Sequence, residues 1–286
     1  MPNEERKLLV VTLGRLGYAE ALELQRAVAR ARIAGEVAED VLLLLEHPPV
    51  VTLGRTAKER HLVASAALLA ARGVEVFEVE RGGDVTFHGP GQLVGYPIVD
   101  LRRHRQDLHW YLRQVEEALI RALGAFGIAA GRDARYTGVW VGADDAAADA
   151  SKRYTLRSGD GAPTASSGDR DLGGGPPREG RPPDEARRTV APRKIAPRKI
   201  ASIGVHARDW VTWHGFALNV TTELSYFDLI IPCGIPDVVM TSVARELGCD
   251  VAMRGVEDAV ASAFGEAFAL DPVRLEPDEL RSTVAR

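Results

Sequence analysis

The sequence is poor in several features that mark whole classes of protein. It has only two cysteines, Cys233 and Cys249, in 286 residues. This scarcity argues against a disulfide-framed secreted domain and indicates a reducing compartment. Its 36 basic and 40 acidic side chains leave a net charge of −4. It therefore lacks the basic excess with which a nucleic-acid-binding protein neutralises phosphates.

Long hydrophobic runs are also missing. No stretch reaches the roughly 18–20 apolar residues that a membrane span requires. The first residues mix charges, Met-Pro-Asn-Glu-Glu-Arg-Lys, and lead into a short apolar run, which differs from a signal peptide. We therefore expect a cytoplasmic protein that binds neither membrane nor nucleic acid.

One segment has few large apolar side chains. Residues 143–198 contain five of them in 56 positions, together with seven prolines and seven glycines. Such a segment cannot bury enough apolar surface to offset its ordering entropy, so the composition predicts a disordered insertion. It ends in a tandem repeat of Ala-Pro-Arg-Lys-Ile. The flanking residues 1–142 and 199–286 are predicted to form one domain, with the insertion as a hairpin loop between strands at 136–141 and 199–206.

The flanks show helical and strand patterns in mixed order. Residues 18–39 are rich in Ala, Leu, Glu and Arg, and residues 108–126 have apolar spacings of three and four, which predicts helices. The apolar runs at 7–13 and 41–46 have strand length. Because the elements do not alternate regularly, the expected fold class is α+β.

The densest group of special residues runs from Arg81 to Gln92, Arg-Gly-Gly-Asp-Val-Thr-Phe-His-Gly-Pro-Gly-Gln. Its glycines permit a ligand to approach the backbone closely, and Arg81 and His88 could orient a polar group. The spacing matches neither a dinucleotide fingerprint nor a P-loop. The alternative is an ordinary pair of hairpin turns.

Two further residues could supply acid–base and nucleophilic chemistry. Lys199 heads an apolar strand and is either a solvated strand start or an acid/base group in a pocket. Lys194, in the first copy of the repeat, precedes Pro197, which disfavours a central strand, so Lys199 is preferred. Cys233 lies in Ile-Ile-Pro-Cys-Gly-Ile-Pro and is either an inert buried residue or a nucleophile. A nearby ammonium would favour its thiolate, and the N–H of Gly234 could stabilise an oxyanion.

Other kinds of site find little support. The histidines near these motifs have no ligand-like spacing and there is no Cys-x-x-Cys, so no metal site is expected. No Gly-x-Ser-x-Gly elbow occurs. A Cys–His route through His88 or His214 stays open. Cys249 follows a helix-end glycine and is interpreted as structural.

Five blocks in order resemble the octanoyltransferases, which are lipoyl(octanoyl) transferases: Glu46 to Arg55, Arg81 to Gln92, Lys199 to His206, Gly215 to Val220 and Pro232 to Ile235. The resemblance implies a single mixed sheet with flanking helices, of the biotin/lipoate protein ligase type. It also implies transfer of an octanoyl group from octanoyl-acyl carrier protein to a lysine of lipoyl domains, through a cysteine thioester and without cofactor or metal.

The same resemblance assigns roles to residues. It implies that Cys233 is the nucleophile and Lys199 its partner. The implied substrate contacts are Arg81, Gly82, Gly83, Asp84, Val85, Thr86, Phe87, His88, Ser202, Ile203, Gly204, Gly215, Phe216 and Ala217. Two alternatives remain, an ATP-dependent lipoate or biotin ligase and a non-catalytic module that binds acyl carrier protein. We expect a monomer.

Overall fold

A mixed β-sheet organises the chain. The computed structural model describes residues 6–142 and 196–284. The sheet has the strand order β12 (Asp271–Arg274), β1 (Lys7–Arg15), β2 (Asp40–Glu46), β6 (Gln92–Ile98), β10 (Val211–Asn219), β9 (Arg198–Arg208), β8 (Tyr136–Val141) and β7 (Ala130–Asp133). A short strand, β11 (Val239–Met240), pairs with the start of β9. Strands β12, β1 and β2 run parallel, and the pairs from β2 to β7 are antiparallel. The predicted α+β class with a mixed sheet is confirmed.

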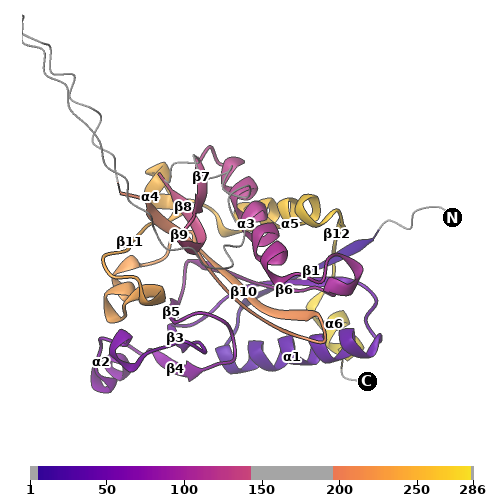
Figure 1. Cartoon of the computed structure of the whole chain (residues 1–286), viewed down its shortest axis with the longest axis horizontal. Coiled ribbons are helices and arrows are strands. Elements are labelled where there is room, and N and C mark those ends of the chain that lie inside the picture. Colours follow the sequence, from indigo (N-terminus) through magenta and orange to yellow (C-terminus); the bar gives the residue numbers. More distant parts are fainter. Residues whose placement is uncertain (1–5, 143–195, 285–286) are drawn as a thin grey trace, which may run out of the picture. The chain divides into compact units, whose positions relative to one another are not determined.

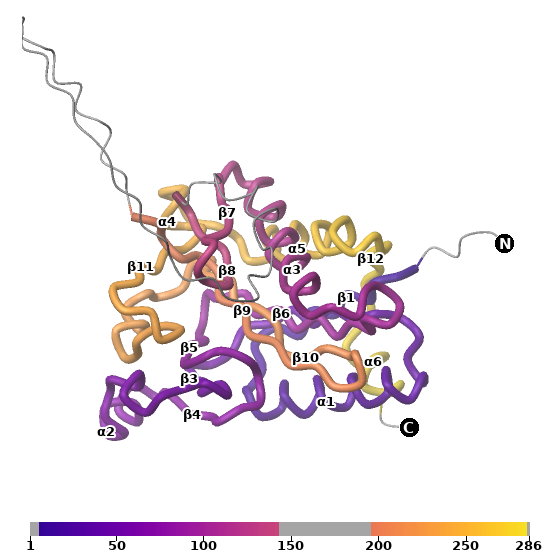
Figure 2. Tube along the Cα trace, in the orientation of Figure 1, coloured from indigo at the N-terminus to yellow at the C-terminus, as the bar shows by residue number. Residues whose placement is uncertain are grey.

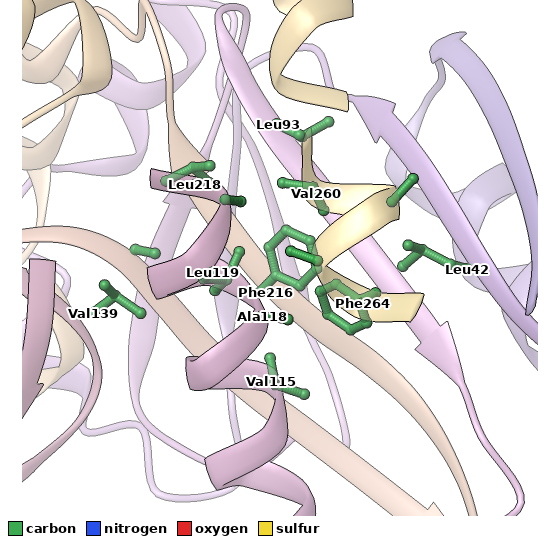
Figure 3. Packing of buried hydrophobic residues seen from close by; sticks show 14 of the residues in the cluster. Leu42, Leu93, Val115, Ala118, Leu119, Val139, Phe216, Leu218, Val260 and Phe264 are labelled. Carbon is green, nitrogen blue, oxygen red and sulfur yellow. The ribbon is translucent and has the colours of Figure 1, made fainter. Parts of the chain in front are cut away.

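Helices cover both faces of this sheet (Figures 1 and 2). On one face lie α3 (Leu108–Gly124) and α5 (Met253–Phe268), and on the other lie α1 (Tyr18–Ala34) and α6 (Pro277–Val284). Strand β2 explains the arrangement, because alternate side chains of a strand point to opposite faces. Leu42 and Leu44 pack in the core under α3 and α5, whereas Leu43 and Leu45 pack in the core over α1. Figure 3 shows the first core, where Phe216 of β10 meets Phe264 of α5.

The first helix is shorter than predicted. It ends at Ala34 rather than Glu39, because Gly35 adopts a left-handed conformation with φ +81°. The N–H of Glu36 then donates to the carbonyl of Ala31 at 2.9 Å, which is the hydrogen bond that closes a glycine-terminated helix. The helical composition continues past this point, but the glycine stops the helix.

The strands on either side of the low-complexity segment form the predicted hairpin. Strands β8 and β9 are antiparallel neighbours, with Val139 opposite Ala201 and Val141 opposite Arg198. Arg198 is already the first residue of β9 and pairs with Glu246 at 2.8 Å. The folded part therefore resumes before the predicted boundary at residue 199. The predicted disorder of residues 143–195 lies outside the described residues.

A second, smaller sheet was not predicted. It has the order β4 (Glu75–Glu78), β3 (Val50–Leu53) and β5 (Val85–His88). Leu69 of helix α2 (Ala66–Ala71) packs in its core with Phe227 of η5 (Leu224–Leu229). Strand β5 carries the centre of the glycine-rich motif, which runs from Arg81 to Gln92, so this sheet positions that motif. The remaining elements are α4 (Val243–Leu247), η1 (Glu59–His61), η2 (Leu101–Arg103) and η6 (Pro232–Gly234).

Membrane-spanning helices are absent from the part of the chain that the structure describes. None of its helices combines the length and the hydrophobicity needed to cross a bilayer.

Candidate active site

One cavity of about 360 Å³ brings the separate sequence motifs together. Its walls come from β9 and β10 of the main sheet, β5 of the small sheet and the η6 turn. All but two of the residues to which the resemblance assigned a role line it: Arg81, Gly82, Gly83, Asp84, Thr86, His88, Lys199, Ser202, Ile203, Gly204, Gly215, Phe216, Ala217 and Cys233.

The two exceptions are Val85 and Phe87. Both belong to β5, where successive side chains alternate between the two faces. Thr86 and His88 face the cavity, whereas Val85 and Phe87 pack in the core of the small sheet. The resemblance implied substrate contact for the whole run, but the alternation separates these two side chains from the cavity.

Lys199 and Cys233 lie against each other. The Nζ atom of Lys199 is 3.2 Å from the Sγ atom of Cys233 and 3.3 Å from the carbonyl oxygen of Thr137. The Lys199 side chain is buried, and its amine also lies 5.2 Å from the centre of the Trp140 ring. The contact brings a possible nucleophile and a possible proton donor together. Lys199 is therefore not a solvated strand start.

Cys233 has an unusual backbone. Its φ is +56° inside the η6 turn, a left-handed conformation that costs a non-glycine residue about 1–3 kcal/mol. The next residue, Gly234, is also left-handed with φ +65°. The N–H of Gly234 donates to the carbonyl of Ile231 at 2.9 Å. It is therefore already engaged, and the suggestion that it stabilises an oxyanion is wrong for this conformation.

Arg81 brings a second buried positive charge to the cavity. Its guanidinium donates to the hydroxyl and carbonyl of Thr52, at 2.8 and 2.7 Å, and to the carbonyl of Gly82 at 3.1 Å. It forms no salt bridge with a carboxylate in the described part of the chain, and burial lowers its pKa. The negative charge of a Cys233 thiolate opposes this shift. The two groups thus interact favourably across the cavity.

Glycines in and around the motif permit close contacts within the chain. The N–H of Gly82 donates to the carbonyl of Val205 at 2.8 Å, so the motif runs along β9. A Cβ atom on Gly204 would lie 2.8 Å from the carbonyl oxygen of Gly82. A Cβ atom on Gly54 would lie 2.7 Å from the Arg81 guanidinium. Gly54 and Gly204 therefore let segments of the protein approach one another. Gly82 and Gly83 line the cavity, and Cβ atoms added to them would meet no atom closer than 3.4 Å, so approach of a ligand to their backbone stays a prediction.

The register of β9 and β10 explains why two tripeptides act together. Gly204 lies opposite Gly215, Ile203 opposite Phe216 and Ser202 opposite Ala217. The two segments singled out separately in the sequence thus form one paired patch of the cavity wall. The hydroxyl of Ser202 lies 3.9 Å from the Cys233 sulfur.

Two tyrosine rings that were not predicted to belong to the site form another part of the wall, with an imidazole ring packed against them. Tyr18 and Tyr96 line the cavity beside His88. The ring of His47 lies 5.2 Å from that of Tyr18, and its Nε2 accepts from the Tyr96 hydroxyl at 2.7 Å. Burial raises the pKa of Tyr18 to about 12. Only the three-dimensional structure groups these residues, because they come from α1, β5, β6 and the β2–β3 turn.

The histidines do not act on the cysteine in this geometry. His88 Nδ1 pairs with the Gln92 side chain at 2.8 Å. His214 is buried and has no hydrogen-bond partner for either ring nitrogen within the described residues. The side-chain partners of the Cys233 sulfur in the described ranges are Lys199 and Ser202. The Cys–His route is therefore not supported.

Burial of the histidines predicts a pH-dependent stability. Desolvation lowers the pKa of His47 to about 4 and that of His88 to about 3, from an ordinary value of 6.5. Both are neutral in the folded protein at pH 5, where the unfolded chain would protonate them. The free energy of unfolding should therefore be highest above pH 6.5 and fall between pH 6.5 and 4. Each histidine contributes about 1.4 kcal/mol per pH unit.

Urea denaturation at pH values from 7 to 4 measures this slope. His47→Asn should flatten it, whereas His109→Asn, at an exposed position of α3, should leave it unchanged. An equal slope in the wild type and the His47→Asn variant would contradict the assignment.

Metal ligands do not cluster in the described residues. They contain no group of three or more His, Cys, Asp or Glu side chains that could hold an ion. Cys249 is free and exposed, just after the Gly248 that ends α4.

Comparison with known proteins places this site in a family. Residues 17–265 match the family model of the lipoyl protein ligase A/B catalytic domain. An octanoyltransferase of Acidobacterium capsulatum is 43% identical over 288 residues, covering 97% of each chain. An octanoyltransferase of Myxococcus xanthus is 43% identical over 270 residues, and the match covers 94% of this chain but 62% of that longer protein.

Solved structures agree on the fold. A bipartite lipoate protein ligase of Thermoplasma acidophilum superposes with a TM-score of 0.64 at 15% identity, covering 98% of this chain and 91% of the other. A lipoate-protein ligase A bound with ATP gives a TM-score of 0.61, also at 15% identity, with coverages of 98% and 93%. At such low identity the likeness concerns the fold alone. By its sequence, the chain belongs to the lipoyl protein ligase A/B catalytic domain family and, within it, to the octanoyltransferases, which are acyltransferases.

Proposed function

We propose that this chain transfers an octanoyl group from octanoyl-acyl carrier protein to a lysine of lipoyl domains, through a thioester on Cys233. The observation that carries the proposal is the 3.2 Å contact between Lys199 Nζ and Cys233 Sγ in the wall of a single cavity. The relatives are named octanoyltransferases. The cysteine supplies a nucleophile that an ATP-dependent ligase does not require.

The first step forms the acyl-enzyme. The Cys233 thiolate attacks the carbonyl carbon of the carrier's thioester, and a new C–S bond forms as the bond to the carrier sulfur breaks. The departing thiolate takes a proton from the Lys199 ammonium. Lys199 is then neutral, and the carrier leaves as a thiol.

The second step reverses the proton transfer. The amine of the acceptor lysine attacks the thioester on Cys233, an amide bond forms, and the Cys233 thiolate leaves. The neutral Lys199 removes the proton of the attacking amine. The enzyme returns to a thiolate beside an ammonium, so the cycle closes without ATP or metal.

The cavity wall supports an acyl substrate. Apolar parts of Phe216, Ile203 and Ala217 line it, and each methylene that becomes fully buried contributes about 0.8 kcal/mol. The buried Arg81 guanidinium, held by neutral partners, favours negative charge in the cavity. We place the octanoyl chain against the paired β9–β10 patch.

A transfer assay tests the proposal directly. The enzyme is incubated with octanoyl-acyl carrier protein and an apo lipoyl domain, without ATP, and the mass of the lipoyl domain is measured. We expect octanoylation. Octanoylation that needs free octanoate and ATP would instead identify an ATP-dependent ligase, and carrier binding without any covalent product would identify a binding module.

The position of the Lys199 amine depends on Gly138. This β8 residue has φ +129°, and an added Cβ atom would lie 2.9 Å from Lys199 Cε and 2.6 Å from the Ala201 carbonyl oxygen. Gly138→Ala should therefore displace the lysine, lower the transfer rate about 10-fold or more, and destabilise the fold by about 1–3 kcal/mol. Transfer kinetics and urea denaturation measure the two effects.

Gly142→Ala provides the matched control. Gly142 also has a positive φ, +75°, but the nearest atom to an added Cβ is 3.8 Å away. This variant should lose stability through backbone strain while keeping its transfer rate. Equal loss of rate in both variants would show that strain, and not contact with Lys199, is responsible.

We further propose that residues 1–142 and the chain from Arg198 onward act as one catalytic domain, as a monomer in the cytoplasm. The cavity is lined from both sides of the low-complexity segment by residues of one chain. Both cysteines are free thiols, which suits a reducing compartment.

A further inference from the structure

A histidine–aspartate pair lies beside the proposed nucleophile. His61, at the end of η1, and Asp84, in the glycine-rich motif, approach to 2.7 Å between Nδ1 and Oδ2. Their side chains are only 10% and 11% exposed. The other carboxylate oxygen of Asp84 accepts from the N–H of Val85 at 2.7 Å. Asp84 is thus held by its own strand and presents one oxygen to the imidazole.

The pair packs directly on the backbone of the η6 turn. A Cβ atom built on Gly234 would lie 2.6 Å from Asp84 Oδ2 and 2.9 Å from the Cε1 atom of His61. The carbonyl of His61 also accepts from the N–H of Ile231 at 2.8 Å. His61 therefore contacts this segment at two points. Its carbonyl accepts from Ile231, which precedes Cys233, and its ring packs against Gly234, which follows Cys233.

The turn needs such support. Cys233 and Gly234 are consecutive left-handed residues, with φ +56° and +65°. A strained conformation persists only where the surroundings over-determine it. Relaxation of Cys233 toward ordinary backbone angles would swing its side chain and break the 3.2 Å contact with Lys199.

The contacts that His61 makes with the described residues do not reach the reacting atoms. Its Nδ1 faces Asp84, and its Nε2 lies 3.5 Å from the Nε atom of Arg60. In the described ranges its side chain has no hydrogen bond with the Cys233 sulfur. It is therefore a positioning residue, not a catalytic residue.

We propose that the His61–Asp84 pair is a clamp that holds the η6 turn in its left-handed conformation and so keeps the Cys233 sulfur on Lys199. The transfer role of Cys233 belongs to the proposed function, on which this inference rests. Removing the clamp should slow every reaction of the sulfur, whereas the binding of substrate in the cavity should change little.

Three variants test the clamp in a Cys249→Ser background, so that Cys233 is the single thiol. His61→Ala removes the ring. His61→Asn restores a donor close to the place of Nδ1, whereas His61→Gln puts its amide further out. We expect Cys233 alkylation by iodoacetamide to slow about 10-fold or more in His61→Ala and His61→Gln, with recovery in His61→Asn. For octanoyl transfer, kcat should fall by a similar factor while KM stays nearly constant.

A second buried pair supplies the control. His104 Nε2 and Asp40 Oδ2 are also 2.7 Å apart, with side chains 3% and 4% exposed, but they join β2 to the segment after η2. His104→Ala should lower the melting temperature without slowing alkylation. If His61→Ala and His104→Ala alkylate at the same rate, or if His61→Gln reacts as fast as His61→Asn, the clamp is wrong.

The alkylation assay also tests the clamp independently of the proposed octanoyl transfer. It needs no octanoyl donor and reports only on the sulfur. A wild-type protein that fails to transfer octanoyl groups would overturn the proposed function, while the alkylation rates of the variants would still decide on the clamp.

Discussion

Cys233→Ser and Cys233→Ala are expected to lose octanoyl transfer by at least about 10³-fold, because the covalent intermediate has no other nucleophile to form on. Intact-mass measurement after incubation with octanoyl-acyl carrier protein should show an acylated wild-type chain and unmodified variants. Serine keeps nearly the size of cysteine, so the left-handed η6 turn should survive in Cys233→Ser.

Cys249→Ser is the matched control for this prediction. Cys249 is the other thiol of the chain and is exposed. Its loss should leave both the acylated mass and the transfer rate unchanged. An acylated Cys233→Ala chain would show that the acyl group resides elsewhere and would remove the basis of the mechanism.

Lys199→Met is expected to slow both half-reactions about 10²–10⁴-fold, the usual contribution of a positioned acid or base. Methionine keeps the apolar stem and roughly the volume of the lysine while removing the amine. Single-turnover measurements should show slow acylation by the carrier and, once acylated, slow release to the lipoyl domain. The alkylation rate of Cys233 should fall as well, because the amine that contacts the sulfur at 3.2 Å is gone.

The free energy of unfolding distinguishes a loss of catalysis in Lys199→Met from a loss of folded protein. Lys199 is buried, and its amine has a carbonyl and a sulfur as hydrogen-bond partners in the described structure, with no carboxylate. Removing such a charge should not destabilise the fold, since its desolvation is no longer required. A Lys199→Met protein that acylates at the wild-type rate would exclude the lysine from the chemistry.

Local patterns in the sequence predicted secondary structure correctly where that structure depends on residue type. The apolar run of β2, the helical spacing of α3 and the turn-forming residues of the glycine-rich motif each act within a few residues of the chain, so they predicted elements that the structure contains. The preference for Lys199 over Lys194 also rested on a local effect, because Pro197 disfavours a continuous strand.

Other features depend on contacts between distant residues and could not be predicted. The small sheet requires β3 and β5 to pair, although their central residues, Thr52 and Thr86, are far apart in the chain. The clamp residue His61 has no neighbouring motif, since its partner Asp84 is 23 positions away. The close approach of Gly204 to the carbonyl oxygen of Gly82 likewise joins two segments that are distant in the chain.

The sequence by itself determined which chemical groups the protein has. They are a rare cysteine between prolines, a lysine at the head of an apolar strand and a glycine-rich motif. The order of these groups along the chain matched one family. Only the tertiary structure decided that the lysine and the cysteine, 34 positions apart, meet at 3.2 Å, and that Val85 and Phe87 turn away from the cavity. The physical reason is that residue type and local spacing are properties of the sequence itself. Distances across a cavity depend instead on how strands β5, β9 and β10 pair and pack, which no local pattern encodes.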